Sequence, residues 1–344
     1  MNTKKKQTTN EIIMAAPMDG YTDLAFRKAL ATNATYRPDR MFTEFVNVEA
    51  IIRDIYSAER ILKHEKLSIP TSAQLFGKNP TSFAQAIPKV LDLGYSGIDI
   101  NMGCGARKIV TNGEGAGLIE NYDLCKQIIE GSSEAINKWI KENDHEQSSI
   151  KFSVKTRLGI NSNIGVEWTK FLDQFKLDFI TIHGRTYKQG YSGSSNWDRI
   201  AQIANLVSTP IIGNGDITNI TDAQEKLRKH NLYGVMIGRN YRSFFADINE
   251  KTPHRTRQKP KPGSDSDPLT FNSVRKTMLD YLTFHENLMA EYFKSSEIAF
   301  ISTRKVLLGF MKGCKNTKSI KNQLMKAESY AKAKLMLAMR FKDQ

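Results

Sequence analysis

The feature that most constrains the fold is a set of eight short apolar segments that recur between residues 11 and 239. Amphipathic stretches of helical character lie between them. Near-continuous apolar strands that alternate with helices predict a parallel sheet covered on both faces. Eight such units within about 240 residues fit a (β/α)8 barrel, with a doubly wound sheet as the alternative. The segments are EIIMAAPM (11–18), MFTEFV (41–46), TSAQLFG (71–77), GIDINMG (97–103), FSVKTRLG (152–159), FITIHGR (179–185), PIIGNGD (210–216) and GVMIGR (234–239).

The carboxyl ends of these segments favour the barrel. Nearly all of them are polar or rich in glycine, and in a (β/α)8 barrel such ends meet at one mouth, where active sites lie. A dinucleotide-binding sheet would need a glycine-rich turn after its first strand, but that turn reads PMDGYTD. The residues at these ends are Asp19 and Gly20, Glu44, Gln74, Asn101 to Cys104, Lys155 and Arg157, His183 and Arg185, Asn214 to Asp216, and Gly238 and Arg239.

The last part of the chain has a different character. Residues 251–268 hold four of the ten prolines and show no hydrophobic periodicity, which is typical of a linker. Beyond them, apolar residues recur at helical three- and four-residue spacing. We therefore expect a catalytic barrel over residues 1–250, a basic linker over 251–268, and a small all-helical domain over 269–344.

The net charge of +14 lies entirely in these later parts. Residues 304–344 hold eleven Lys or Arg and two Asp or Glu, and residues 251–262 hold five Lys or Arg and no acid. Subtracting these from the totals of 50 and 36 leaves 34 basic and 34 acidic residues, so the remaining chain is neutral. A neutral body with basic appendages indicates a polyanionic partner, although a solvated helix face would carry the same charge.

The sequence predicts a cytoplasmic protein without membrane association. No apolar run approaches the roughly 18 to 20 residues that a membrane span needs. The first residues are basic, but the apolar run after them is short and contains Pro17, so we expect no secretory signal. The three cysteines, Cys104, Cys125 and Cys314, are too few and too scattered for a disulfide framework or a four-thiolate zinc site. We expect no metal site.

Cys104 is the first candidate for chemistry. It lies between two glycines at the end of the fourth predicted strand, and Arg107 and Lys108 follow it closely. A thiol with a reference pKa of about 8.5 is mostly protonated at neutral pH, so it can act as an acid, or as a nucleophile if cations activate it. A buried structural cysteine is the alternative.

Two cations lie on one face of the fifth strand. Lys155 and Arg157 are two residues apart, and alternate strand residues face the same side. Because an unpaired buried charge is costly, two cations in a barrel mouth require an anion or an electron-rich ligand. The alternative is an ion pair across the barrel with Asp99, Glu44 or Asp216.

The last three strands add a candidate ligand contact and a candidate phosphate site. His183 and Arg185 end the sixth strand, and a histidine beside an arginine at a mouth favours contact with a ligand. NGDI (214–217) and IGR (237–239) end the seventh and eighth strands, where (β/α)8 barrels often bind phosphate through backbone N–H groups.

These motifs together carry a family resemblance. In their order and spacing they are similar to those of the flavin-dependent, bacterial-type tRNA-dihydrouridine synthases, and the similarity covers essentially all of residues 11–245. The helical tail resembles that family's RNA-binding domain in placement and character. The motifs are AAPMDGYTDLAFR, AQLFG, GIDINMGCGARK, VKTRLG, HGRTYKQGYSGSSNW, IGNGDI and VMIGR.

The resemblance implies a (β/α)8 barrel that binds FMN and reduces a uracil in tRNA, with hydride from reduced flavin to C6 and a proton from Cys104 to C5. NADPH or NADH would reduce the flavin transiently. The implied FMN-binding residues are Pro17, Met18, Asp19, Gln74, Lys155, His183, Asn214, Gly215, Asp216, Gly238 and Arg239. The implied uracil-binding residues are Asn101, Arg157 and Tyr191.

One position departs from the family pattern, which usually has proline after the cysteine where this chain has Gly105. Loss of the fixed φ leaves the Cys104 loop less pre-ordered.

Two other functions are considered. One is an FMN oxidoreductase acting on a free pyrimidine or another small substrate, which would need no basic helical domain. The other is an RNA-binding protein without catalysis, which would not need Cys104. We expect a monomer without an obligate protein partner.

Overall fold

The computed structural model describes residues 11–146, 149–245, 271–312, 314 and 317–339, so the linker predicted over 251–268 lies outside the described residues. The chain divides into two compact units. One comprises Met1–Met18 and Pro38–Gly238, and the other comprises Asp19–Arg37 and Arg239–Gln344.

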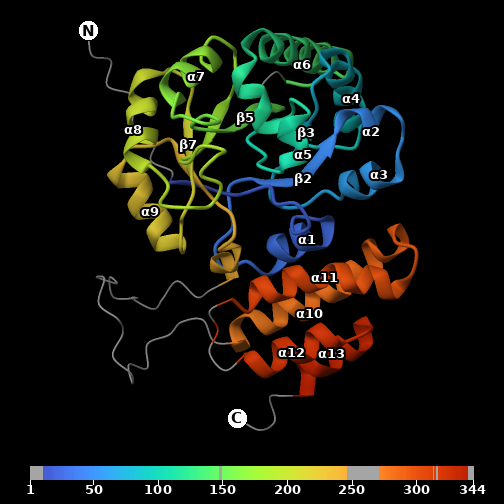
Figure 1. The fold of residues 1–344 in the computed structure, drawn as a ribbon. Coiled ribbons are helices and arrows are strands. Elements are labelled where there is room, and N and C mark those ends of the chain that lie inside the picture. The colour runs from blue at the N-terminus through green and yellow to red at the C-terminus, as the bar shows by residue number, and fades with distance from the viewer. Residues whose placement is uncertain (1–10, 147–148, 246–270, 313, 315–316, 340–344) are drawn as a thin grey trace. The chain divides into compact units, whose positions relative to one another are not determined.

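The first unit is built on eight parallel strands (Figure 1). Their order is β1-β8-β7-β6-β5-β4-β3-β2, so each strand lies beside its neighbour in the chain. Between β1 and β2, Met14 forms a parallel bridge with Arg40, and the Ala15 N–H donates to the Arg40 carbonyl at 2.9 Å. This order confirms the predicted (β/α)8 barrel and rules out the doubly wound sheet. The strands are β1 (Ile12–Ala15), β2 (Met41–Asn47), β3 (Thr71–Phe76), β4 (Gly97–Met102), β5 (Lys151–Arg157), β6 (Phe179–His183), β7 (Ile211–Asn214) and β8 (Gly234–Ile237).

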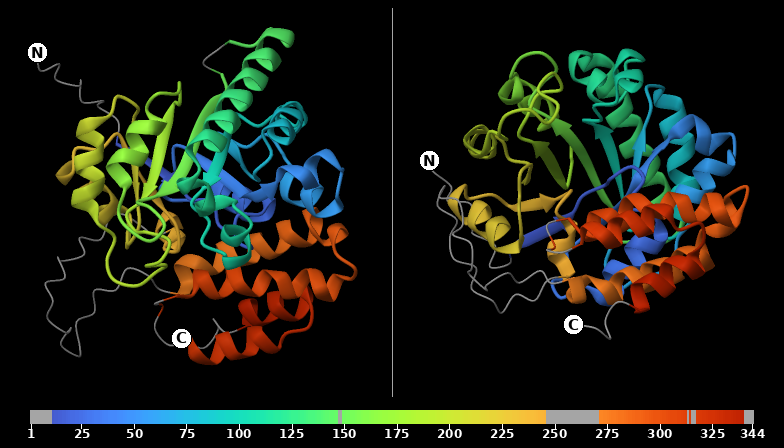
Figure 2. Two further views of the ribbon diagram at one scale, coloured as in Figure 1. Left: turned by 45° about the horizontal axis from the view of Figure 1, so that its top comes forward. Right: turned by 60° about the horizontal axis from the view of Figure 1, so that its bottom comes forward.

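Helices lie outside these strands, as the views in Figures 1 and 2 agree. Five of them are preceded by a capping asparagine whose side chain accepts a backbone N–H of the first turn, the favoured way to satisfy such a donor: Asn47, Asn79, Asn121, Asn196 and Asn219. The helices of this unit are α2 (Val48–Ile52), α3 (Tyr56–Leu62), α4 (Pro80–Asp92), α5 (Arg107–Thr111), α6 (Tyr122–Glu142), α7 (Gly165–Leu172), α8 (Trp197–Leu206) and α9 (Ile220–Lys229), with a 3-10 turn, η1 (Gly115–Glu120).

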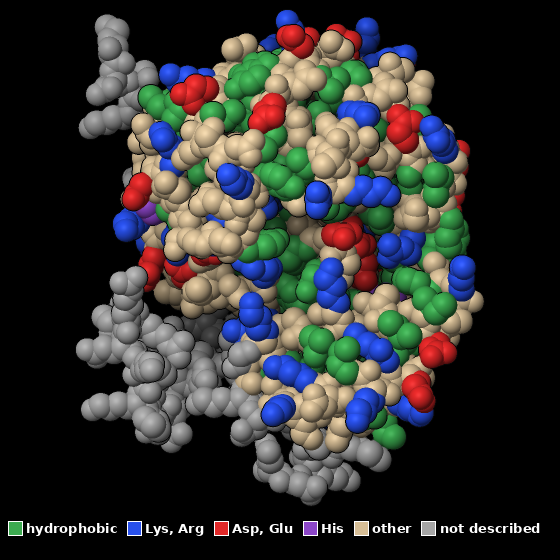
Figure 3. Space-filling model, in the orientation of Figure 1, with side chains coloured by type: hydrophobic (Ala, Val, Ile, Leu, Met, Phe, Trp, Pro, Cys, Tyr) green, Lys and Arg blue, Asp and Glu red, His purple; other side chains and the backbone are tan. Residues whose placement is uncertain are grey.

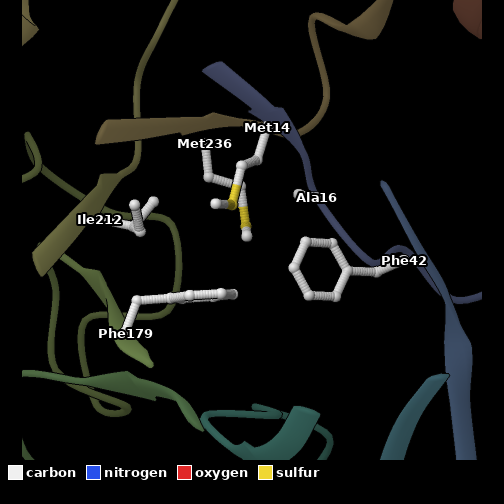
Figure 4. Packing of buried hydrophobic residues seen from close by; sticks show 6 residues of the cluster. All are labelled: Met14, Ala16, Phe42, Phe179, Ile212 and Met236. Carbon is white, nitrogen blue, oxygen red and sulfur yellow. The ribbon is translucent and has the colours of Figure 1, made fainter. Parts of the chain in front are cut away.

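The barrel interior has an apolar side and a polar side. Figure 4 shows side chains from β1, β2, β6, β7 and β8 pointing toward one another in a buried cluster. The cluster comprises Met14, Ala16, Phe42, Phe179, Ile212 and Met236. On β3, β4 and β5 the buried side chains include Ser72, Asp99 and Ser153 instead. Polar side chains buried at these positions indicate that the strands serve a purpose other than packing.

The second unit is helical. Its C-terminal helices α10 (Phe271–Leu288), α11 (Ser296–Phe310), α12 (Lys318–Lys326) and α13 (Tyr330–Met339) pack side by side, with a 3-10 turn, η3 (Ala290–Tyr292), after α10 (Figure 2). This confirms the predicted helical C-terminal region. No helix in the described residues is long and apolar enough to cross a membrane.

Helix α1 (Leu24–Asn33) belongs to this second unit and packs on α10, although it precedes β2 in the chain. The 3-10 turn η2 (Tyr241–Phe245) joins it through the Tyr241 ring, which meets Phe26 at 4.9 Å and Phe310 at 5.3 Å, both edge to face. The Tyr241 hydroxyl donates to the Val306 carbonyl at 2.8 Å. The sequence predicts a barrel over all of residues 1–250, whereas the helical unit also contains residues 19–37 and the η2 segment.

Candidate active site

The polar side chains of the barrel form rows across neighbouring strands. Asp99 on β4 is in register with Gln74 on β3 and with Ser153 on β5. Two residues further along, Asn101 is in register with Lys155. Since alternate residues face the same side of a strand, both rows point into the barrel, the second one nearer the carboxyl ends of the strands.

Hydrogen bonds link the first row and connect it to the second row through Asn101. The Gln74 Nε2 group donates to Asp99 Oδ2 at 2.6 Å, and the Ser153 hydroxyl donates to Asp99 Oδ1 at 2.6 Å. Asn101 Nδ2 donates to Gln74 Oε1 at 2.9 Å. Asp99 is fully buried, and burial raises the pKa of its carboxyl to about 6 although the hydrogen bonds from Gln74 and Ser153 oppose that shift.

Cys104 lies in the loop that follows β4. Asn101 Oδ1 accepts the N–H groups of Gly103 at 3.0 Å and of Cys104 at 2.7 Å, an asparagine-capped turn. From the other side, Arg157 Nε donates to the Gly103 carbonyl at 2.8 Å. The Cys104 side chain is partly exposed, and none of the three cysteines, all within the described residues, forms a disulfide.

The two cations of β5 have amide and carbonyl partners. Lys155 Nζ donates to Asn214 Oδ1 at 3.2 Å. Arg157 donates to the backbone carbonyls of Thr186 and Gly190 as well as to that of Gly103. Within the described part of the chain, neither cation forms the ion pair with Asp99, Glu44 or Asp216 that was the structural alternative.

The electrostatic cost of these cations shows in their pKa values. Burial lowers the pKa of Lys155 to about 8, and the neighbouring Arg157 adds to the shift. Burial also lowers the pKa of Arg157. A site that destabilises two positive charges in this way favours binding of an anion, which would offset the cost.

Two residues of the turn after β7 have positive φ. Gly215 has φ of +121° and Asp216 has φ of +52°. The Asp216 carboxylate accepts from Arg185 Nη2 at 2.6 Å and from the Ser195 N–H at 2.7 Å. Although burial opposes it, these hydrogen bonds lower the pKa of Asp216. Arg185 also donates to the Ser195 hydroxyl at 2.9 Å, so it holds two loops together instead of standing ready for a ligand.

The other predicted site residues fall into three groups. Pro17 and Met18 come two and three residues after the end of β1. Gly238 directly follows β8 and lies near them, since a Cβ built on Gly238 would lie 3.7 Å from Ala16 Cβ and 3.9 Å from Met18 Sδ. His183 ends β6, and its ring centroid lies 6.3 Å from that of Tyr191, whose side chain is 64% exposed. Asp19 and Arg239 belong to the helical unit.

Comparison with known proteins decides the family. The sequence profile of the dihydrouridine synthase family (Dus) matches residues 14–344. The chain belongs to this family. It is 29% identical over 331 residues to a Staphylococcus aureus (strain Mu50 / ATCC 700699) protein named probable tRNA-dihydrouridine synthase, covering 94% of this chain and 90% of that one. A protein of the same name from Aquifex aeolicus (strain VF5) is 28% identical over 335 residues, covering 96% and 94%.

The fold has a solved counterpart in histamine dehydrogenase from Rhizobium sp. 4-9. That structure gives a TM-score of 0.50 at 13% identity, over 67% of this chain and 44% of that one. The similarity supports the barrel architecture. Within the described residues, no group of three or more His, Cys, Asp or Glu side chains could hold a metal ion.

Gly105 directly follows Cys104, at the position where the family resemblance leads us to expect proline. A Cβ at Gly105 would lie 3.5 Å from Arg157 Nη2 and 3.8 Å from Tyr187 Cδ2, which is ordinary van der Waals contact. The neighbours therefore leave room for a side chain, and the glycine is not required by packing.

The sequence did not indicate a site role for Asp99 or Ser195. The signal for Asp99 was available, because it lies two residues before Asn101 and so shares its face of the strand. Ser195 carries no such signal, since its place beside Asp216 depends on how the loop after β6 folds.

Proposed function

We propose that this dihydrouridine synthase reduces the C5–C6 double bond of specific uridines in tRNA to 5,6-dihydrouridine, with FMN as cofactor and Cys104 as proton donor. The observation that carries the proposal is the Cys104 loop, which Asn101 and Arg157 hold at the mouth of the barrel. The similarity of the chain to proteins named tRNA-dihydrouridine synthases supports the substrate.

The residues at the barrel mouth fit FMN. Lys155, whose pKa burial lowers, and the positive-φ turn at Gly215 and Asp216 favour an anion such as a phosphate or a reduced flavin. A Cβ built on Gly238 would lie in ordinary van der Waals contact with Ala16 Cβ and Met18 Sδ. When bound, FMN would supply hydride to C6 of the uracil and would itself be reduced by NADPH or NADH. The residues proposed to hold it are Pro17, Met18, Asp19, Gln74, Lys155, His183, Asn214, Gly215, Asp216, Gly238 and Arg239.

Cys104 is proposed to hold the proton that goes to C5. A proton donor should be a neutral acid that stays protonated at working pH, and a thiol meets that requirement near neutrality. The hydrogen bonds to the Gly103 and Cys104 amides fix the backbone that carries the thiol. Asn101, Arg157 and Tyr191 are proposed to hold the uracil, which must be flipped out of the RNA to enter the barrel.

The helical unit is proposed to hold the tRNA. Figure 3 shows Lys and Arg side chains spread over it on the face drawn. On α13, Lys332 pairs with Glu328 at 2.5 Å and Lys334 with Glu286 at 2.6 Å. On α12, Lys318, Lys321 and Lys326 have no acidic partner within the described residues. These three lysines are therefore the better candidates for phosphate contacts.

Replacing Cys104 tests the chemistry. We expect Cys104→Ala to keep bound flavin, read from its visible absorbance, and to lose dihydrouridine formation in tRNA, read by mass spectrometry of nucleosides. Cys125→Ala is the matched control, because the Cys125 thiol is buried and donates to the Leu118 carbonyl. A Cys104→Ala protein as active as the control would remove Cys104 from the mechanism.

Charge reversal on α12 tests the RNA partner. Changing Lys318, Lys321 and Lys326 to Glu should weaken tRNA binding and reduce the slope of log affinity against log salt by up to about 3, since each phosphate contact contributes about 0.9. The same change at Lys332 and Lys334 should have less effect, because these lysines already have acidic partners. Full activity on free uridine with no tRNA binding would favour the alternative, an oxidoreductase for a free pyrimidine.

We propose a cytoplasmic monomer with no obligate protein partner.

A further inference from the structure

A single line of hydrogen bonds connects the buried Asp99 carboxylate to the backbone of Cys104. It runs from Asp99 Oδ2 through the Gln74 amide and the Asn101 amide to the N–H groups of Gly103 and Cys104. Its four side-chain and backbone contacts are 2.6, 2.9, 3.0 and 2.7 Å long. Every member is buried apart from the loop at its end.

The direction of this line is fixed by its two ends. An ionised carboxylate can only accept, and a backbone N–H can only donate. Gln74 must therefore turn Nε2 toward Asp99, which leaves Oε1 for Asn101. Asn101 must turn Nδ2 toward Gln74, which leaves Oδ1 for the two amides. Reversal of either amide group would place two donors or two acceptors face to face, at a buried site where an unmade hydrogen bond is costly.

We propose that Asp99 is a positioning residue that orients Gln74 and Asn101 and thereby fixes the Cys104 loop at the barrel mouth. This inference rests on the proposed function, because it concerns the loop that carries the proposed proton donor. Asp99 touches neither the loop nor the mouth itself. It acts through the two amides, and the hydroxyl of Ser153 occupies its other oxygen.

The burial of Asp99 supports a role beyond packing. A fully buried carboxylate is costly, as its raised pKa records, and Arg40 and Lys155 are the cations close enough to favour its charge. An apolar residue at this position would avoid the cost but would leave Gln74 Nε2 without its acceptor, so that the Gln74 amide could rotate.

The orientation also limits how Asn101 can meet a substrate. Its Oδ1 already accepts two N–H groups, and one of its two Nδ2 hydrogens goes to Gln74. One N–H remains. Asn101 can therefore serve a uracil only as a donor to a carbonyl oxygen, and it cannot accept the N3–H.

Hydrogen exchange of the Gly103 and Cys104 amides tests the relay without relying on activity. Asp99→Leu should speed their exchange about tenfold, the effect of losing about 1.4 kcal/mol of protection. Asp99→Asn should exchange at near the native rate, because the Oδ1 atom of the new asparagine can still accept from Gln74 while its amide donates to Ser153. Ser153→Ala is the matched control. It removes the other contact of Asp99 and should leave both amides protected.

A second variant covers the case in which Asp99→Leu does not fold. Gln74→Met keeps an unbranched side chain of similar length but breaks the line at its middle, so it should also speed exchange of the two amides. Unchanged exchange in a folded Asp99→Leu or Gln74→Met protein would overturn the inference, as would equal loss of protection in Ser153→Ala. Because exchange is read without RNA, an inactive wild-type protein would instead count against the proposed function alone.

Discussion

Replacing Gly215 with alanine should destabilise the barrel unit at the site proposed for phosphate. Gly215 has φ of +121°, a conformation that costs an L-residue about 1–2 kcal/mol. The new Cβ would overlap the Ser195 hydroxyl and lie 2.8 Å from His183 Cδ2 and 2.9 Å from Ser195 Cβ. Rotation of the hydroxyl would relieve the first contact but not the other two, so overpacking adds about 1–3 kcal/mol. We expect a loss of about 2–5 kcal/mol.

Thermal unfolding of the flavin-free protein measures this loss. For a unit of this size, 3 kcal/mol corresponds to a fall in Tm of about 6–12 °C. Gly238→Ala is the control, because Gly238 lies at the neighbouring strand end but its Cβ would meet nothing closer than 3.7 Å. The reasoning fails if Gly215→Ala melts within about 2 °C of the native protein, or if Gly238→Ala is lowered as much. Flavin affinity, measured separately, should fall in Gly215→Ala because His183 and the turn are displaced.

Two further predictions concern buried groups elsewhere in the chain. Gly309→Ala should lower the free energy of unfolding of the helical unit by about 1–3 kcal/mol in urea titrations, because its Cβ would overlap the buried Tyr241 hydroxyl and lie 3.0 Å from Tyr241 Cζ. Adding Tyr241→Phe should recover much of that loss, and a more stable single variant would contradict the packing. The pKa of Asp99 is about 6 in the folded state, above the ordinary value of 3.8. Between these two pH values the folded state therefore binds more protons than the unfolded state. As a result, the free energy of unfolding falls as pH rises from about 4 to about 6. Relative to Asp99→Asn, the native protein should therefore lose up to about 3 kcal/mol over that range and no more above it, and a constant difference across pH would refute the shift.

The barrel could be predicted from the sequence because its determinants are local. Each buried strand is a short apolar run, and each helix is amphipathic, so the sequence alone shows where strands and helices occur. The two-residue period of a β-strand placed Lys155 and Arg157 on one face of their strand. The polar residues that follow the strands indicated the mouth of the barrel, because their positions after each apolar run can also be seen in the local sequence.

The partners of those residues could not be predicted, because they depend on register. Gln74 meets Asp99 only because β3 and β4 pair with these two residues side by side, and a shift by one residue would turn every side chain to the other face. Sequence reasoning therefore left open an ion pair between Lys155 and an acid, whereas the structure gives Lys155 the amide of Asn214.

The sequence by itself determined the class of fold and the excess of positive charge in the C-terminal region, and it predicted the strand ends at which we propose the chemistry. Only the tertiary structure decided that α1 packs with α10 in the helical unit, and that a buried carboxylate directs the hydrogen bonds of the Cys104 loop. The physical reason is the same in both cases. Periodicity and charge are properties of a segment, but a packing partner or a hydrogen-bond direction is a property of two segments brought together.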